Sequence, residues 1–191
     1  MGSVSMAMPI YMIPHSVPYL YTGEFVLRKS RGECWVFVCG FVARDDGPKG
    51  AYLPARYLQD KLLHAADASL SRGNRYDILQ ALWNVLRKHP KSKLGTDLGT
   101  NLSILMAAGD ARGVNLSATG ISGLWGESHH GVWLPMVPSG NPILSARGVE
   151  DKEQGSLFVA DPPRRVVATT HLHRAVFPTE EESKKYMRGG A

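Results

Sequence analysis

The stretch Val36-Phe37-Val38-Cys39-Gly40-Phe41 decides the fold, because it is an apolar run of β-strand character that ends in Cys-Gly. A second extended run, Pro18–Leu27, precedes it, and the turn residues Ser30-Arg31-Gly32 separate the two, which predicts a β-hairpin. The two cysteines, Cys34 and Cys39, are five positions apart on one strand, so their side chains point to opposite faces. They can therefore form neither a disulfide with each other nor a joint metal site.

Length and composition indicate a single globular domain. The 191 residues fit one domain of the usual size, and we expect residues 1–16 to be loosely ordered and residues 17–191 to form the domain. The sequence has no basic leader and no apolar run of about 18 residues, and its two cysteines stay reduced, so we expect a cytoplasmic protein with no membrane span. The net charge of +5 favours anionic partners, but the cations are dispersed, which makes nucleic-acid binding a minor alternative.

The pattern after the first hairpin predicts two helices followed by strands. A breaker-rich loop over residues 44–50 leads into helices over residues 53–70 and 75–89. The later strands are expected in three antiparallel pairs, residues 102–108 with 114–120, 124–125 with 132–134, and 156–160 with 165–170. A short helix is expected over residues 180–187. Strands segregated from helices are typical of an α+β packing, and we predict an antiparallel β-sandwich flanked by helices.

Two more features complete a recognisable order. Gly23-Glu24 stands on the first strand, and Arg165–Leu172 is an apolar run that ends in Thr-His. Taken with Cys39-Gly40 and the two helices, this order resembles the metal-dependent serine/threonine protein phosphatases of the PPM class, over about residues 19–177. In that family, Gly-Asp, Asp-Gly and Ser/Thr-Asp-Gly at these places bind two divalent cations. The resemblance implies a PPM-like fold truncated at the C-terminus, because the strand with the last acidic pair would follow Ala191.

The departures from the family pattern concern the metal ligands. The resemblance places the metal-site positions at Glu24, Cys39, Gly40, Thr170 and His171, and only Glu24 keeps a carboxylate. Mg²⁺ and Mn²⁺ require hard oxygen ligands, and a single carboxylate cannot neutralise two such cations about 4 Å apart. The resemblance therefore implies a pseudophosphatase that keeps the fold, binds no metal or other cofactor and has lost hydrolysis.

Other polar residues offer rival metal sites. Asp45 and Asp46 could hold a displaced cation, which would make the chain an unorthodox metal-dependent phosphatase, although Asp-Asp-Gly before proline is more often turn chemistry. His171 and His173 share one strand face and His129-His130 sits in a turn, but zinc needs three or four ligands together. We interpret the histidines as structural or solvated, and the unorthodox phosphatase stays open as an alternative.

The segment Trp125–Pro142 is the candidate surface for binding another protein. It combines aromatic residues, Met136 and several prolines with no lysine, and Glu127 is its one acidic residue. The cores of protein interfaces are enriched in aromatic residues and Met and depleted in Lys and Glu. We predict that Trp125, Trp133 and Met136 contact a partner protein, as a regulator or as part of an assembly. The alternative is that the same residues cover one edge of the sandwich.

Overall fold

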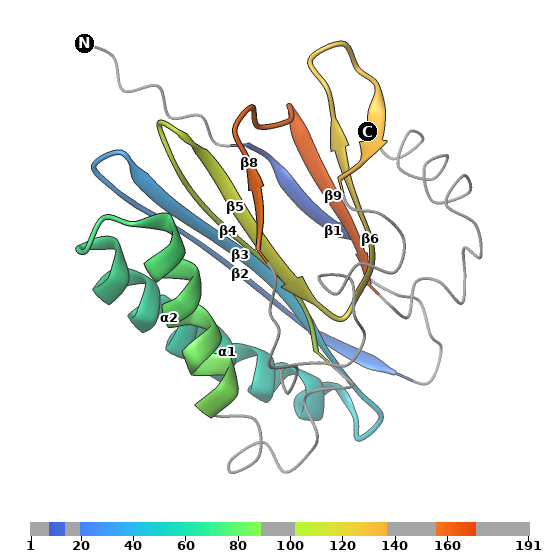
Figure 1. The fold of residues 1–191 in the computed structure, drawn as a ribbon. Coiled ribbons are helices and arrows are strands. Elements are labelled where there is room, and N and C mark those ends of the chain that lie inside the picture. Colours follow the sequence, from blue (N-terminus) through green and yellow to red (C-terminus); the bar gives the residue numbers. More distant parts are fainter. Residues whose placement is uncertain (1–7, 14–19, 89–101, 137–155, 171–191) are drawn as a thin grey trace.

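The computed structural model of the chain describes residues 8–13, 20–88, 102–136 and 156–170. These residues form two β-sheets packed face to face, and two helices cover the outer face of the larger sheet (Figure 1). The larger sheet has the strand order β2-β3-β4-β5-β8, and the smaller sheet has the order β1-β9-β6-β7. The predicted α+β class and the sandwich flanked by helices are therefore confirmed. All strand pairs are antiparallel in the described residues except β1 with β9, which is parallel.

The elements follow the order of strands, helices and strands that the sequence predicted. They are β1 (Ile10–Ile13), β2 (Tyr21–Arg31), β3 (Cys34–Arg44), α1 (Pro48–Leu70), α2 (Arg75–Lys88), β4 (Leu102–Asp110), β5 (Gly113–Thr119), β6 (Ile121–Glu127), β7 (Trp133–Pro135), β8 (Leu157–Val159) and β9 (Arg165–Thr170). The hairpins β2–β3 and β4–β5 and the pair β6–β7 stand where they were predicted. The helix expected over residues 180–187 lies outside the described residues. Neither α1 nor α2 is long and apolar enough to span a membrane.

The predicted hairpin of residues 156–160 with 165–170 is wrong. The two strands belong to different sheets, because β8 pairs with β5 in the larger sheet while β9 pairs with β1 and β6 in the smaller one. The connection over residues 160–164, which contains Pro162-Pro163, crosses between the sheets instead of turning back within one. Each strand finds its partner among distant residues, so closeness in sequence did not decide the pairing.

Two boundaries also differ from the predictions. Ile10–Ile13, which falls in the segment expected to be loosely ordered, forms the edge strand β1 and pairs with Val166–Thr169. Helix α1 begins at Pro48, five residues before the predicted start at residue 53. Proline is well suited to the first helical position, because its missing N–H would have no partner there and its φ already fits the helix. The breaker residues therefore begin the helix, and the loop before it is shorter than predicted.

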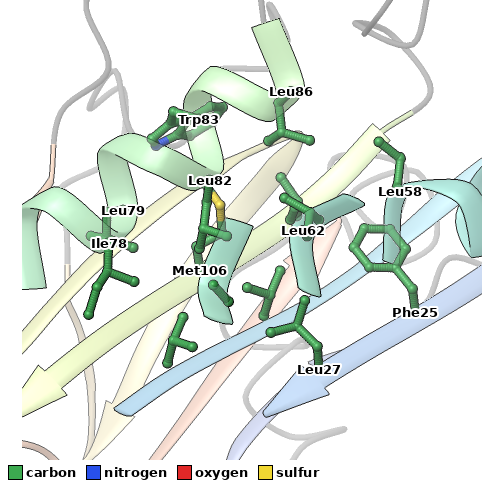
Figure 2. Close-up of a cluster of buried hydrophobic side chains, with 14 of the residues drawn as sticks. Phe25, Leu27, Leu58, Leu62, Ile78, Leu79, Leu82, Trp83, Leu86 and Met106 are labelled. Carbon is green, nitrogen blue, oxygen red and sulfur yellow. The ribbon is translucent and has the colours of Figure 1, made fainter. Parts of the chain in front are cut away.

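The larger core lies between the two helices and the five-stranded sheet. Leu58 and Leu62 of α1 and Leu82 of α2 are fully buried and point toward the sheet (Figure 2). The sheet contributes the alternating residues Phe25 and Leu27 of β2 to the same cluster. Spacing of three or four residues on the helices and of two on the strands thus brings the apolar faces together.

A second core fills the space between the two sheets. It contains Cys39, Leu105 and Leu116 from the larger sheet and Leu124 and Val166 from the smaller one. Cys34, by contrast, belongs to the core beneath the helices. The prediction that the two cysteines point to opposite faces is therefore confirmed, and both are free thiols.

Gly120 alone connects β5 in the larger sheet to β6 in the smaller sheet, and it provides a stability test. Its φ is +66, and an added Cβ would lie 2.0 Å from the carbonyl oxygen of Leu102. Gly32, in the β2–β3 turn, has φ +60 but open space around an added Cβ. We expect Gly32→Ala to cost about 1–2 kcal/mol, the strain of the left-handed conformation alone. Gly120→Ala should cost more, because the backbone must also shift. Chemical denaturation measures both, and equal losses would contradict this account of the corner.

Candidate functional site

Cys39 lies in the middle of β3, on the face that packs against the smaller sheet. Val26 of β2 and Leu105 of β4 stand opposite it in the sheet. Burial raises the pKa of its thiol to about 12, so the group is neutral at physiological pH. A neutral buried thiol is a poor ligand for Mg²⁺ or Mn²⁺, which bind oxygen.

Gly40 points to the opposite face of β3, and packing explains why it is a glycine. An added Cβ would lie 2.4 Å from the Cζ atom of Phe25 and 2.8 Å from the carbonyl oxygen of Ser103. The aromatic ring of Phe25 therefore occupies the space that any side chain at position 40 would need. This residue serves the core beneath the helices.

The other positions at which the sequence analysis expected a degenerate metal site lie on separate elements. Glu24 is exposed on β2, opposite Phe41, and it shares a sheet face with Cys39 at one diagonal step, which typically spans about 7–8 Å. Thr170 ends β9 in the smaller sheet and is fully buried opposite Ile121. His171 lies outside the described residues. In the part of the chain that the structure describes, no three His, Cys, Asp or Glu side chains gather to hold a metal ion.

Asp45 and Asp46 lie between β3 and α1, and Asp46 forms an ion pair. The Nε of Arg44 donates a hydrogen bond of 2.9 Å to Oδ1 of Asp46, and its Nη2 contacts Oδ2. The hydrogen bond from Arg44 lowers the pKa of the Asp46 carboxyl. The carboxylate also lies against Gly50, where an added Cβ would be 2.0 Å from Oδ1. The contacts of Asp46 with Arg44 and Gly50 fix the turn that leads into α1. This agrees with the interpretation of Asp46 as a turn residue.

The histidines belong to no metal site in the described residues. His129 and His130 are exposed between β6 and β7, and His129 lies 3.9 Å from a carboxylate oxygen of Asp161. His173 lies outside the described residues.

The outer face of the smaller sheet carries the predicted aromatic residues. Trp125 and Trp133 cluster there with Val167, and they are only 5% and 9% exposed. The Trp125 ring lies over Gly123, where an added Cβ would be 2.0 Å from it. Met136 is half-buried and packs against the core between the sheets. Their burial favours the alternative that these side chains cover part of the sandwich, and their contact with a partner protein stays a prediction.

Next to this cluster, the exposed apolar side chains belong to the β6–β7 connection and to β7. Val132 is 51% exposed and Leu134 is 55% exposed. Leu134 alternates with the buried Trp133 along β7, so the two side chains point to opposite faces of the strand, and Leu134 is left in solvent. These two residues, which sequence reasoning did not single out, form the exposed apolar part of the β6–β7 hairpin.

Glu127 and Arg165 form a charged network beside the tryptophans. The two residues stand opposite each other on β6 and β9, and the Nη2 of Arg165 donates a hydrogen bond of 3.0 Å to Oε1 of Glu127. The guanidinium of Arg165 also lies over the Trp133 ring, 5.4 Å from its centre. The hydrogen bond from Arg165 lowers the pKa of the Glu127 carboxyl. No local sequence signal predicted this pair, because 38 residues separate its members.

The Glu127–Arg165 pair predicts a pH dependence of stability. Because the folded-state pKa of Glu127 is depressed, its contribution is present above the usual carboxyl range and is lost as the pH falls through the folded-state pKa. Glu127→Gln should therefore be less stable than wild type at neutral pH, and the difference should shrink on acidification. Urea denaturation across acidic to neutral pH measures this, with Glu33→Gln as the control at an exposed carboxylate in the β2–β3 turn. A difference that stays constant with pH would contradict the assignment.

Comparisons with known proteins find little similarity. No protein-family model matches the sequence, and no curated protein matches it. A solved structure, the RsbU and RsbW domains of Rv1364c from Mycobacterium tuberculosis, is similar with a TM-score of 0.49 and 13% sequence identity. The similarity covers 80% of this chain and 39% of that structure.

Proposed function

We propose that this chain is a catalytically inactive, PPM-phosphatase-like protein that binds or regulates another protein. The observation that carries the first half is Cys39: where the family pattern has a metal-binding aspartate, this chain has a buried thiol with a pKa of about 12. Thr170, at the third expected acidic position, is also fully buried. Of the expected acidic positions that fall within these 191 residues, Glu24 alone carries a carboxylate, which is too little charge for two divalent cations.

The proposed surface for binding another protein lies at the β6–β7 hairpin. A domain that is folded but catalytically inactive can still bind another protein through its surface. The exposed apolar part of the β6–β7 hairpin, Val132 and Leu134, supports this surface, because both side chains lie in solvent next to the buried Trp133 in the sequence. In this proposal, the exposed Val132 and Leu134 contact the partner protein, and the buried Trp125 and Trp133 pack within the sandwich.

Two experiments test the two halves separately. Isothermal titration with Mn²⁺ should give no heat of paired-metal binding, whereas two binding events lost in Glu24→Ala would revive the unorthodox phosphatase. Affinity capture from the native cell should retain a specific protein that Val132→Ser/Leu134→Ser no longer binds. Leu53→Ser, at a 63% exposed leucine on α1, is the matched control. A partner lost equally with the control would move the surface elsewhere, and specific capture of RNA or DNA would revive the nucleic-acid alternative.

A further inference from the structure

Among the described residues, no strand pairs with the outer edge of β2 in the larger sheet. β2 is the first strand in the order β2-β3-β4-β5-β8, and its 11 residues pair with β3 on one side only (Figure 1). Val26, at its centre, is 54% exposed, and Glu24 and Arg28 are exposed on the same face. The smaller sheet therefore does not cover this part of the larger one. A long open edge is a template for pairing with another strand.

Alternation along β2 shows which main-chain groups face the open edge. The β2–β3 turn has two residues, so Arg31 and Cys34 on either side of it exchange hydrogen bonds. Counting back from Arg31, every second residue, which includes Lys29 and Leu27, forms main-chain hydrogen bonds with β3. The residues between them, which include Arg28 and Val26, direct their N–H and C=O groups away from β3. A side-chain contact agrees with this assignment, because the Nε2 of Gln59 in α1 donates a hydrogen bond of 2.7 Å to the carbonyl oxygen of Val26.

The charges of β2 match when the strand is paired with an antiparallel copy of itself. If Val26 faces Val26 of the second copy, Glu24 faces Arg28 and Arg28 faces Glu24. Val26 is also the middle residue of Tyr21–Arg31, so the same register gives the longest overlap. In this register, the outward-directed main-chain groups of the two strands meet each other. Opposite charges directly across a strand pair stabilise it, and like charges there destabilise it.

We propose that β2 forms an antiparallel pair with β2 of a second copy of this chain, centred on Val26, which joins the two larger sheets into one continuous sheet. The two Glu24–Arg28 pairs set the register, and main-chain hydrogen bonds supply the contact. In the described part of the chain, neither Glu24 nor Arg28 has an ion-pair partner. The pairing leaves Gln59 in place, because a carbonyl oxygen can accept two hydrogen bonds. This inference is independent of the proposed function.

The test is sedimentation equilibrium of the full chain and two charge-reversal variants, from micromolar to millimolar concentration. Wild type should shift from 20.9 kDa towards twice that mass. Glu24→Arg alone and Arg28→Glu alone should each lower the association constant by about tenfold or more, because both attractive pairs become repulsive. Raising the salt concentration should weaken the wild-type association.

A mixture of Glu24→Arg and Arg28→Glu tests the proposed charge pairing most directly. In the mixed pair, one copy carries two arginines and the other two glutamates, so both cross-strand pairs are again attractive. An equimolar mixture should therefore regain the wild-type mass, and this regain also shows that both variants are folded. The double variant Glu24→Arg/Arg28→Glu should likewise associate with itself. A wild type that stays monomeric, single variants that associate as wild type does, or a mixture that stays monomeric would each overturn the proposal.

Discussion

Replacing Cys39 with aspartate, the residue that the family pattern has at this position, is expected to destabilise the protein by about 3–5 kcal/mol at neutral pH, the scale of an uncompensated buried charge. Cys39 lies between the two sheets, opposite Val26 and Leu105, and it is only 5% exposed. A carboxylate there would lose its hydration among apolar side chains and gain no cationic partner from these neighbours. Urea denaturation measures the loss.

The pH dependence of this variant separates charge from shape. Burial raises the pKa of a carboxyl group, so the penalty of Cys39→Asp should grow as the pH rises above the ordinary carboxyl range and shrink below it. Cys39→Asn, which has a similar shape and no charge, should show a smaller loss that does not vary with pH. A Cys39→Asp variant as stable as wild type that also binds Mn²⁺ would show that the site remains able to hold metal.

Replacing Leu62 with alanine is expected to lower the free energy of unfolding by about 2–5 kcal/mol, the usual cost of truncating a buried leucine. Leu62 is fully buried at the centre of α1 and lies in the same cluster as Leu27 of β2 and Leu82 of α2 (Figure 2). Its removal leaves a cavity where the two helices and the sheet meet. Because both helices depend on this contact, the loss should affect the whole domain.

Leu53→Ala is the matched control for Leu62→Ala. Leu53 stands in the same helix, but it is 63% exposed, so its truncation should change the stability by no more than about 0.5 kcal/mol. Thermal or urea denaturation of both variants gives the comparison. Similar losses at the two positions would mean that α1 does not present the face described here to the sheet.

Local patterns in the sequence predicted the elements whose contacts are close in sequence. The β2–β3 hairpin followed from an apolar run on each side of a short turn, and α2 followed from the spacing of Ile78 and Leu82 and the stop before Pro90. The opposite orientation of Cys34 and Cys39 followed from strand alternation alone. Each of these inferences needs only a period of two or of three to four residues.

Contacts between distant residues could not be predicted in the same way. Ile10–Ile13 has no short-range partner, and it becomes a strand because Val166–Thr169 lies beside it. Glu127 and Arg165 meet only because β6 and β9 pair in one particular register. Trp125 looked like an exposed contact residue, since its burial depends on Val167 and on the space above Gly123. Strand pairing across the whole chain decides all three cases.

In the candidate site too, some features were predictable from local sequence and others depend on contacts between distant residues. The identities of Cys39 and Thr170 were visible in the sequence, but their burial came from the packing of the two sheets. The structure adds a reason for Gly40 as well, because the Phe25 ring fills the space beside it. These positions pack within the cores, which is why a charged side chain there should be costly.

The most direct test of the central claim, that this fold carries no phosphatase activity, is a turnover assay with a phosphopeptide or p-nitrophenyl phosphate in millimolar Mn²⁺. The proposal predicts a rate no greater than that of the buffer for the wild-type protein, for Glu24→Ala and for Asp46→Ala. Hydrolysis by the wild type that either substitution abolishes would contradict it, because the activity would then depend on a carboxylate of this chain.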